Sequence, residues 1–267
     1  MSVHIFFPVY NEVGLEKYLS KLAFALSNEF SRELFFFTVV DDGSVNPVDI
    51  SIAKRFNRVS IEVLRHAKNA GLGCALNTGL NHIALKVSPK DLVLTIEGDG
   101  TIPIDSIMSA IERLKIKNLS PDVVIFSVYQ HSGGFIGVPK IRLILSRTAN
   151  IMVRNILGFH GIWAATSFNR ALKGAALLRL KEMSGERMIT KLGFDCNIEL
   201  LASFMKLKLQ IEEMPVVIDQ STRSNSKMKI MRTIRNYLYV FLGALKIRKS
   251  IKSGYRSSLL GTNAPGK

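Results

Sequence analysis

The sequence predicts an α/β protein built on a doubly wound, mostly parallel sheet that is flanked by helices. Apolar runs typical of strands alternate with stretches of helical spacing, as in VHIFFPV, LEKYLSKLAFALSNEF and LFFFTVV. Two apolar runs end in acids and glycine, in VVDDGS and TIEGDG. A continuous apolar run that stops at a turn signal is typical of a buried strand. Because strands and helices alternate, a parallel sheet is favoured.

The expected elements follow one another closely along the chain. A helix at 15–30 is indicated by apolar residues on one face, such as Leu15, Leu19 and Leu22. Residues 131–137, HSGGFIG, are expected to form a glycine-rich loop. We expect strands at 3–12, 34–41, 59–66, 91–100, 122–130 and 209–218, and helices at 15–30, 49–56, 69–87, 140–157 and 194–206. The order is less regular after residue 122 than before it.

Length and composition favour one folded domain, with or without an appendage. The chain has 267 residues, 47% of them hydrophobic, so it can bury a full core. Its two cysteines, Cys74 and Cys196, are too few for a disulfide framework and have no zinc-binding spacing. We therefore expect a reduced, cytoplasmic protein. The start MSVHIFFPVYNE lacks a basic region and a long apolar run, so we expect no export signal.

Positive charge is concentrated near the C-terminus. The net charge is +15, which indicates anionic partners. Residues 223–267 contain eleven Lys or Arg and no Asp or Glu. The apolar residues that recur there at helical spacing are Met231, Ile234, Leu238, Phe241 and Leu245. The uncharged run at 236–245 is too short to cross a bilayer, which takes about 20 residues.

We divide the chain into an α/β domain at residues 1–222 and a basic tail at residues 223–267. The tail is expected to be an amphipathic helix that lies in the interface of an anionic membrane, because it combines basic residues with an apolar stripe. A helix docked on the protein core is the alternative. Nucleic acid is the least favoured anionic partner, because stacking aromatics are not interleaved with the basic residues.

Carboxylates stand at the ends of two expected strands. In open α/β sheets ligands bind beyond the carboxyl ends of the strands, so Asp41 and Asp42 are expected beside a ligand. Glu97 and Asp99 lie two residues apart, and at an extended strand end both side chains point to one side. An oxygen-only ligand pair of this kind favours Mg²⁺ or Mn²⁺. Taken alone the pattern is weak, and solvated loop acids are the alternative.

Several motifs occur in the order that a known family has. FPVYNE, VVDDGS, RHAKNAGLGCAL and IEGDGT resemble family 2 glycosyltransferases of the GT-A fold. Four later segments, SRTAN, FDCNIELL, IEEMPVVI and RSNSKM, narrow the resemblance to the polyprenyl-phosphate branch, which is similar to dolichol-phosphate mannosyltransferase. The resemblance covers roughly residues 3–235. It implies a nucleoside-diphosphate sugar as donor and inversion at the anomeric carbon.

The resemblance also implies roles for individual residues. The nucleotide-sugar-binding residues that it implies are Pro8, Tyr10, Glu12, Asp41 or Asp42, Arg65, Lys68, Gly71, Gly73 and Gly98. Glu97 and Asp99 occupy the metal motif, with Thr101 as a further oxygen ligand, and Asp99 is expected to be catalytic. Glu97 departs from the family pattern, in which Asp is more usual. The metal implied is again Mg²⁺ or Mn²⁺.

On the acceptor side the resemblance implies basic residues, and one departure matters. Arg147 is expected to be catalytic and to contact the acceptor phosphate, with Arg223 and Lys227 near it. Where the family usually has an acid shortly before Ser-Gly-Phe-Arg, this chain reads WAATSFNR and has Ala164. A candidate general base is therefore missing. Because a phosphate monoester has a second pKa of about 6 and needs no base, Ala164 favours a phosphate acceptor.

We therefore expect a metal-dependent inverting glycosyltransferase that moves a sugar from a nucleoside-diphosphate sugar to a polyprenyl phosphate. It would lie peripherally on the inner face of the cytoplasmic membrane. Transfer to a glycan hydroxyl is one alternative. A catalytically inactive nucleotide-sugar-binding protein is another, because both Glu97 and Ala164 depart from the family pattern.

Overall fold

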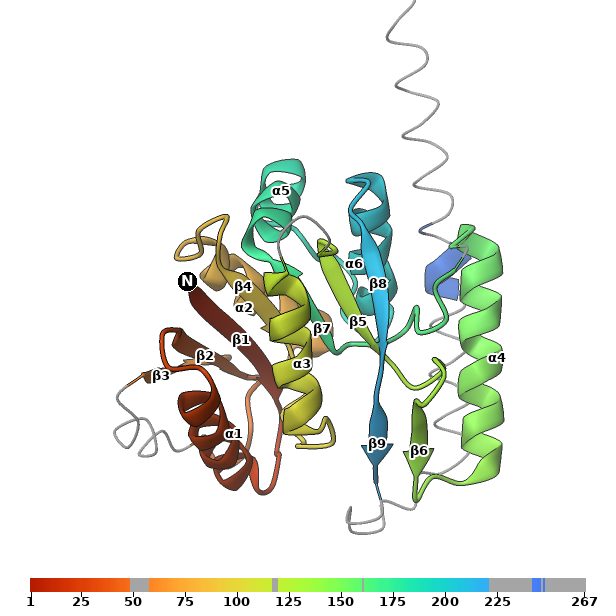
Figure 1. Ribbon diagram of the computed structural model, residues 1–267. Coiled ribbons are helices and arrows are strands. Elements are labelled where there is room, and N and C mark those ends of the chain that lie inside the picture. The colour runs from red at the N-terminus through yellow and green to blue at the C-terminus, as the bar shows by residue number, and fades with distance from the viewer. Residues whose placement is uncertain (49–57, 117–119, 160, 221–241, 246, 248–267) are drawn as a thin grey trace, which may run out of the picture.

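The fold is seen in a computed structural model that describes residues 1–48, 58–116, 120–159, 161–220, 242–245 and 247. A seven-stranded sheet runs through the molecule, and helices lie on both of its faces (Figure 1). A separate two-stranded sheet lies at one side. The predicted α/β class with a mostly parallel sheet is confirmed.

The first part of the chain forms the parallel half of the large sheet. Its elements are β1 (Ser2–Val9), α1 (Leu15–Glu29), β2 (Leu34–Asp41), β3 (Val59–Arg65), α2 (Leu72–Ala84) and β4 (Leu92–Thr95). The strands lie in the order β3-β2-β1-β4 and pair in parallel. Strand β4 is shorter than predicted, so Glu97 and Asp99 lie in the turn beyond it. The predicted helix at 49–56 lies outside the described residues.

The second part of the chain is less regular. Its elements are α3 (Ile104–Lys115), β5 (Val123–Ser127), β6 (Gly134–Ile136), α4 (Lys140–Leu157), β7 (Arg170–Lys173), α5 (Gly174–Ser184), α6 (Cys196–Lys206), β8 (Ile211–Pro215) and β9 (Val217–Asp219). The large sheet continues from β4 through β7 and β5 to β8, and β7 is antiparallel to both of its neighbours. Strand β6 pairs in parallel with β9 in the small sheet.

Two predictions for this part were wrong. The predicted loop at 131–137 contains β6. The predicted strand at 209–218 is two strands, because the chain leaves the large sheet at Pro215 and enters the small one at Val217. Elements α3, α5 and β7 were not predicted from the sequence. Helix α4 agrees with its predicted bounds and lies beside the small sheet (Figure 1).

The core lies on both faces of the sheet, which explains why β1 is an unbroken apolar run. Phe6 belongs to the hydrophobic cluster that includes α2, α5 and α6, while Ile5 and Phe7 belong to the cluster that includes α1 and α3. All three side chains are fully buried. Burial on both faces is typical of a central strand in a parallel sheet.

The described part of the predicted basic tail contacts the protein. Ala244 and Ile247 are buried in the cluster that includes α2, α5 and α6. The remainder of the tail lies outside the described residues, including Arg223, Lys227 and the apolar stripe at 231–241. For the short segment that is seen, the structure thus agrees with the docked alternative. Within the described part of the chain, no helix has the length and apolar content to span a membrane.

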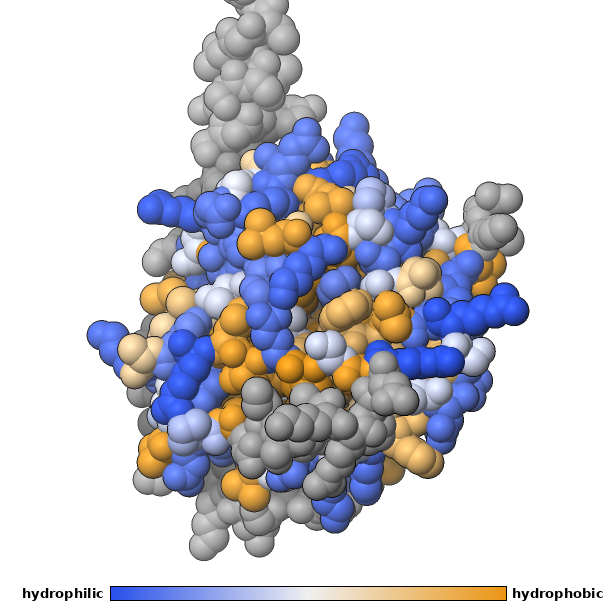
Figure 2. Space-filling view, turned by 90° about the vertical axis from the view of Figure 1, so that its left-hand side faces the viewer, coloured by the Kyte–Doolittle hydropathy of each residue, from blue (hydrophilic) through white to orange (hydrophobic). Residues whose placement is uncertain are grey.

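Strand β3 forms one edge of the large sheet. Figure 2 shows this side of the molecule, where hydrophilic side chains project between patches of hydrophobic surface. Glu62 of β3 pairs with Lys86 at 2.6 Å and with His82 at 2.8 Å. Charged side chains on an edge strand oppose pairing with the edge of another sheet.

Asp91 ties the start of β1 to the start of β4. Its carboxylate accepts hydrogen bonds from the backbone N–H of Ser2 at 2.7 Å and from the backbone and hydroxyl of Ser88 at 2.8 and 2.7 Å. Burial acts to raise the pKa of this carboxyl, but the hydrogen bonds outweigh burial and lower the pKa. The carboxylate therefore stabilises the fold above the unfolded-state pKa, and that contribution is lost as the pH falls through the folded-state pKa.

We predict that Asp91→Asn lowers the free energy of unfolding at neutral pH by about 1–2 kcal/mol, because an amide cannot accept all of these hydrogen bonds. The gap between wild type and variant should narrow below about pH 4, as the wild-type carboxyl becomes protonated. Urea unfolding followed by circular dichroism across the acidic range measures both effects. A gap that stays constant with pH would show that the charge of Asp91 is not what stabilises the fold.

Candidate active site

The carboxyl ends of β1 and β2 lie side by side, and the loops after them are hydrogen-bonded together. The backbone N–H of Asp42 donates to the carbonyl of Val9 at 2.8 Å. The backbone N–H of Asn11 donates to Ser44 Oγ at 2.8 Å, and that of Val45 donates to Asn11 Oδ1 at 2.9 Å. The loops after β1 and β2, which were predicted to bind the donor, therefore form one continuous rim at this edge of the sheet.

The residues predicted in the first of these loops lie in different surroundings. Pro8 is part of β1, whereas Tyr10 is 51% exposed. Glu12 lines a cavity of about 340 Å³ together with Asn46 and Val48. The rim therefore has an exposed aromatic ring next to a hollow that is lined by both loops.

Asp42 has a structural part in this rim. Its carboxylate accepts hydrogen bonds from the backbone N–H groups of Ala70 and Gly71, at 2.9 and 2.8 Å. His66 Nδ1 lies 2.6 Å from the same carboxylate, and His66 Nε2 lies 3.0 Å from Thr78 Oγ1. Both carboxylate oxygens are thus engaged, and they fix the segment after β3 against the turn after β2.

In the described part of the chain, only one carboxylate oxygen of Asp41 accepts a hydrogen bond, whereas both oxygens of Asp42 do. Asp41 Oδ1 accepts the backbone N–H of Ser44 at 2.8 Å, while Oδ2 is buried and has no hydrogen-bond partner among the described residues. Arg65 Nη1 is 3.8 Å from Oδ2, and Arg65 Nη2 donates to the carbonyl of Ser44. Lys68 is exposed, at a turn whose backbone packs directly on Gly43. Two cations therefore flank the end of β2.

Gly71 and Gly73 make room for a distant loop. The backbone N–H of Gly73 donates to the carbonyl of Leu192 at 2.9 Å, and a Cβ at Gly73 would overlap the carbonyl oxygen of Lys191. Glu199 holds that loop from the other side, because its carboxylate accepts the backbone N–H of Lys191 at 2.9 Å. The glycine-rich segment is therefore a packing site as well as the entry to α2.

The predicted metal motif follows β4. Thr101 donates to Asp99 Oδ1 from its backbone at 3.0 Å and from its hydroxyl at 2.7 Å, which orients the carboxylate. The backbone N–H of Glu97 donates to Asn169 Oδ1 at 2.8 Å. Gly98 lies between the two acids and packs closely on β1. Within the described residues, no three His, Cys, Asp or Glu side chains are grouped in a way that could hold a metal ion.

Burial shifts the pKa of two titratable groups, Tyr18 and Arg170. Burial and, secondly, the carboxylate of Asp99 raise the pKa of Tyr18. Burial lowers the pKa of the fully buried Arg170 to about 10, so its guanidinium stays charged at neutral pH. Arg170 Nη2 donates to the backbone carbonyl of Asn197 at 2.7 Å. This bond connects the centre of the sheet to a residue of the neighbouring cavity.

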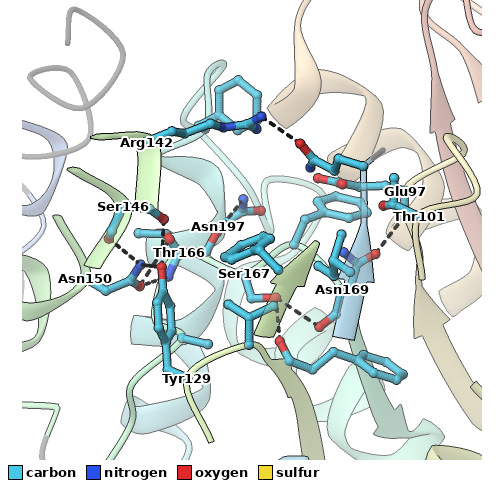
Figure 3. Close-up of a pocket in the computed structure, with 18 residues that line it drawn as sticks. Glu97, Thr101, Tyr129, Arg142, Ser146, Asn150, Thr166, Ser167, Asn169 and Asn197 are labelled. Atoms are coloured by element: carbon cyan, nitrogen blue, oxygen red, sulfur yellow. Dashed lines mark hydrogen bonds between the residues drawn. The ribbon is translucent and has the colours of Figure 1, made fainter. Parts of the chain in front are cut away.

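That cavity, of about 280 Å³, lies between the end of β4 and helix α4. Its polar lining comprises Glu97, Thr101, Tyr129, Arg142, Ser146, Asn150, Thr166, Ser167, Asn169, Asn197 and Gln220, and its apolar lining Phe126, Val128, Phe135, Ala164, Phe168, Phe194 and Ile218. Figure 3 shows Glu97 and Thr101 on one side and Ser146 and Asn150 on the other, with Arg142 near the top. Glu97 and Thr101 of the metal motif thus open into a cavity that is lined by both polar and apolar side chains.

One face of α4 forms a wall of this cavity. Arg142, Ser146 and Asn150 lie four residues apart and so face the same way. Arg142 Nη1 donates to Gln220 Oε1 at 2.7 Å, and Ser146 Oγ lies 2.7 Å from the hydroxyl of Tyr129. The sequence reading missed Arg142, although its four-residue spacing from Ser146 and Asn150 was a signal that could have been used.

The structure does not bring all the predicted acceptor residues into this cavity. Arg147 is exposed on α4 and is absent from the cavity lining. Arg223 and Lys227 lie outside the described residues. Among the described residues that line the cavity, Arg142 is the one cation and Glu97 the one carboxylate. A role for Arg147 in acceptor binding stays a prediction.

Ala164 is held in place by an acid from another strand. Glu213 Oε1 accepts the backbone N–H groups of Trp163 and Ala164 at 2.8 and 2.6 Å, and Glu213 Oε2 accepts from Gln130 at 2.8 Å. The carboxylate of Glu213 is thus occupied in shaping the loop. Glu213 does not line the cavity, so it does not supply the acid that Ala164 lacks.

Comparison with known proteins gives a family match and distant relatives. Residues 4–174 match glycosyl transferase family 2. The chain is 24% identical over 215 residues to an uncharacterized protein of Methanocaldococcus jannaschii, with 80% of each chain covered. It is 26% identical over 212 residues to a dolichyl-phosphate beta-glucosyltransferase of Trichomonas vaginalis, and the match covers 78% of this chain and 58% of that protein.

A solved structure shows a similar fold. It is the glucosyl-3-phosphoglycerate synthase of Mycobacterium tuberculosis in complex with Mg²⁺ and UDP. The TM-score is 0.58 at 18% identity, with 92% of this chain and 79% of that chain covered. At this identity the likeness shows the fold alone.

The family match indicates a transferase that uses a nucleotide sugar. Because the family match covers more than half of its residues, the chain belongs to glycosyl transferase family 2 and is a glycosyltransferase. The predicted family is thereby confirmed, and the branch within it stays a prediction.

We predict that Gly73→Ala lowers the free energy of unfolding by about 1–3 kcal/mol, because the added methyl group meets backbone rather than a flexible side chain. Gly134→Ala is the matched control, since a Cβ there has nothing within 4 Å. Urea unfolding measures both, and calorimetry measures nucleoside-diphosphate binding. If Gly73→Ala behaved like the control in both measurements, the loop at 191–192 would not be held by this contact.

Proposed function

We propose that this chain transfers a sugar from a nucleoside-diphosphate sugar to a polyprenyl phosphate, with inversion at the anomeric carbon and with Mg²⁺ or Mn²⁺ as cofactor. The donor would lie over the carboxyl ends of β1, β2 and β4. The acceptor phosphate would enter the cavity beside Glu97. The name of the Trichomonas vaginalis relative, a dolichyl-phosphate beta-glucosyltransferase, supports a lipid-phosphate acceptor.

The charge of the cavity is the observation that carries this proposal. Glu97, the one carboxylate among the described lining residues, belongs to the metal motif, and Ala164 replaces the expected acid. Among the described residues of the lining, no second carboxylate is in place to take a proton from a hydroxyl acceptor. A phosphate monoester is already anionic at neutral pH and can attack the anomeric carbon itself. Arg142 would hold this phosphate by charge-assisted hydrogen bonds.

Donor binding is proposed for the rim formed by the loops after β1 and β2. The oxygen of Asp41 that lacks a hydrogen-bond partner suits a donor N–H or hydroxyl of the base or ribose. The exposed ring of Tyr10 suits stacking on the base. Arg65 and Lys68 are exposed nearby and would contribute positive charge toward the diphosphate.

Glu97 and Asp99 fit a divalent cation that arrives with the nucleotide. Mg²⁺ and Mn²⁺ prefer oxygen ligands, and Mg²⁺ is usually held by one or two carboxylates together with substrate phosphates. Thr101 already orients the Asp99 carboxylate. When bound, the cation would neutralise negative charge on the departing diphosphate. The Mycobacterium tuberculosis synthase, solved with Mg²⁺ or Mn²⁺ and UDP, supports a metal of this kind.

Transfer of radiolabelled sugar tests the proposal. The full chain would be incubated with each nucleotide sugar of a panel, Mn²⁺ or Mg²⁺, and undecaprenyl or dolichyl phosphate. We expect label in the chloroform phase with at least one donor, and none when the lipid carries a hydroxyl in place of the phosphate. Label that enters only soluble glycans, under the same conditions, would overturn the lipid-phosphate acceptor.

A glycan hydroxyl acceptor is the second candidate. The cavity has many neutral polar groups, among them Ser146, Asn150, Thr166 and Ser167, which suit the hydroxyls of a sugar. Tight donor binding without transfer to either kind of acceptor would instead support an inactive nucleotide-sugar-binding protein.

For the metal motif we predict that Asp99→Asn lowers kcat on the order of 100-fold or more, because an amide cannot neutralise the cation. Glu97→Asp should lower kcat less than Asp99→Asn does, since the carboxylate is kept. Asp105→Asn is the control, because Asp105 is exposed at the start of α3. Initial rates across a Mn²⁺ titration measure all three. Wild-type rates for Asp99→Asn at every Mn²⁺ concentration would refute the metal assignment.

For the acceptor we predict that Arg142→Gln raises the KM for a short, water-soluble polyprenyl phosphate about tenfold or more, because a charged hydrogen bond contributes about 1.5–3 kcal/mol. The KM for the nucleotide sugar should stay nearly unchanged. Arg147→Gln is the matched comparison on the same helix. If Arg147→Gln gave the larger rise in acceptor KM, Arg147 and not Arg142 would contact the acceptor phosphate, as the sequence resemblance implies.

A further inference from the structure

Helix α4 packs Val153 in the core, but it also exposes large apolar residues on the side that faces away from the cavity. Its inner side carries Arg142, Ser146 and Asn150 into the cavity. Its outer side exposes large apolar residues, namely Ile141 (49%), Ile144 (61%), Ile151 (36%) and Met152 (41%). A surface helix normally turns its apolar stripe toward the core and its polar face toward water. The outer side of α4 therefore exposes more large apolar side chains than the water-facing side of a surface helix normally does.

A line of cations runs along the apolar residues. Lys140, Arg147 and Arg154 are seven residues apart, close to two helical turns, so they lie nearly in one row. Helix α4 contains no Asp or Glu. The guanidinium of Arg154 lies 4.1 Å from the centre of the Trp163 ring, which is 41% exposed. Apolar side chains, a row of cations and an exposed tryptophan together are typical of a helix in a membrane interface.

We propose that this outer face of α4, made of the four apolar residues and the row of Lys140, Arg147 and Arg154, docks on the surface of an anionic lipid bilayer. The apolar side chains enter the boundary between headgroups and acyl chains, and the cations contact anionic headgroups. The helix lies along the surface and does not cross the bilayer. This surface belongs to the folded domain and is separate from the predicted basic tail.

The positive charge of this face favours an anionic bilayer over the tail of this chain or a second copy of it. The tail of this chain at 223–267 carries eleven basic residues and no acids, so docking it on the outer face of α4 would bring like charges together. The described tail residues Ala244 and Ile247 are instead buried in the core cluster. A second copy docked through the same face would bring two such rows together, with the same penalty. An anionic bilayer is complementary in both charge and hydrophobicity.

If the proposed function holds, docking through α4 would also bring the acceptor phosphate close to the cavity. The inner side of the same helix lines the cavity, so a lipid phosphate in the bilayer would be one helix diameter, about 10 Å, from Arg142. The headgroup of the acceptor could then reach the cavity while its polyprenyl chain stays among the lipids.

Vesicle binding by the full chain tests the proposal. The probe is a suspension of large vesicles of phosphatidylcholine and phosphatidylglycerol that contain no polyprenyl phosphate. We compare wild type with the double variant Ile144→Ser/Ile151→Ser. Phe24→Ser is the control, because Phe24 is 62% exposed on α1. Losing two apolar side chains that would be buried in the bilayer should lower the partition coefficient of the double variant about tenfold or more, and the control should bind like wild type.

The other outcomes overturn the proposal. If the double variant sedimented with vesicles as well as wild type does, α4 would not be a docking surface. If wild type were a dimer by light scattering and the double variant a monomer, the face would be an interface between copies. Unchanged nucleoside-diphosphate binding by calorimetry shows that the variant is folded. Because these vesicles hold no acceptor, a failure of lipid-phosphate transfer would count against the proposed function and leave this result standing.

Discussion

The buried carboxylate of Asp42 is the interaction on which the donor side of the site depends. It accepts hydrogen bonds from the backbone of Ala70 and Gly71 and lies within hydrogen-bond distance of His66. The segment after β3 is thereby fixed to the end of β2, and an unpartnered buried carboxylate at this place would be costly. Both oxygens of Asp42 are engaged, whereas Asp41 Oδ2 has no hydrogen-bond partner among the described residues, which is why we propose Asp41 as the donor contact. Adjacent acids in one motif thus have different tasks.

The sequence predicted the parallel half of the fold, because it is encoded locally, and the same motifs led to the proposed donor site. The run at 34–41 is apolar until it ends in acids, and its burial does not depend on which helix covers it. Strand β7 could not be found in this way, because Arg170–Lys173 is four residues long and carries a cation at each end. Arg170 is fully buried only because β7 lies between β4 and β5.

The acceptor side was predictable only in part, because it depends on which face of α4 turns inward. Arg142 and Arg147 are on the same helix, and five residues separate them by about 140°. Periodicity identifies the helix, but the packing of α4 beside the small sheet decides that Arg142 lines the cavity and Arg147 is exposed. The same packing places apolar residues outside, which links the cavity to the proposed membrane surface. Sequence motifs alone favoured Arg147.

We propose that the acceptor phosphate attacks the anomeric carbon without an enzyme base, since the cavity beside Glu97 offers no further carboxylate among its described lining residues. The pH dependence of kcat/KM for the acceptor tests this most directly, because it reports the ionisation of the free enzyme and of the free acceptor. A limb with a pKa of about 6 is predicted for a phosphate monoester. When the phosphate of the acceptor is replaced by a phosphonate of higher pKa, this limb of the pH profile should move to higher pH by the difference between the two pKa values. A limb that stays in place when the acceptor is changed would reveal a base on the enzyme and contradict the account.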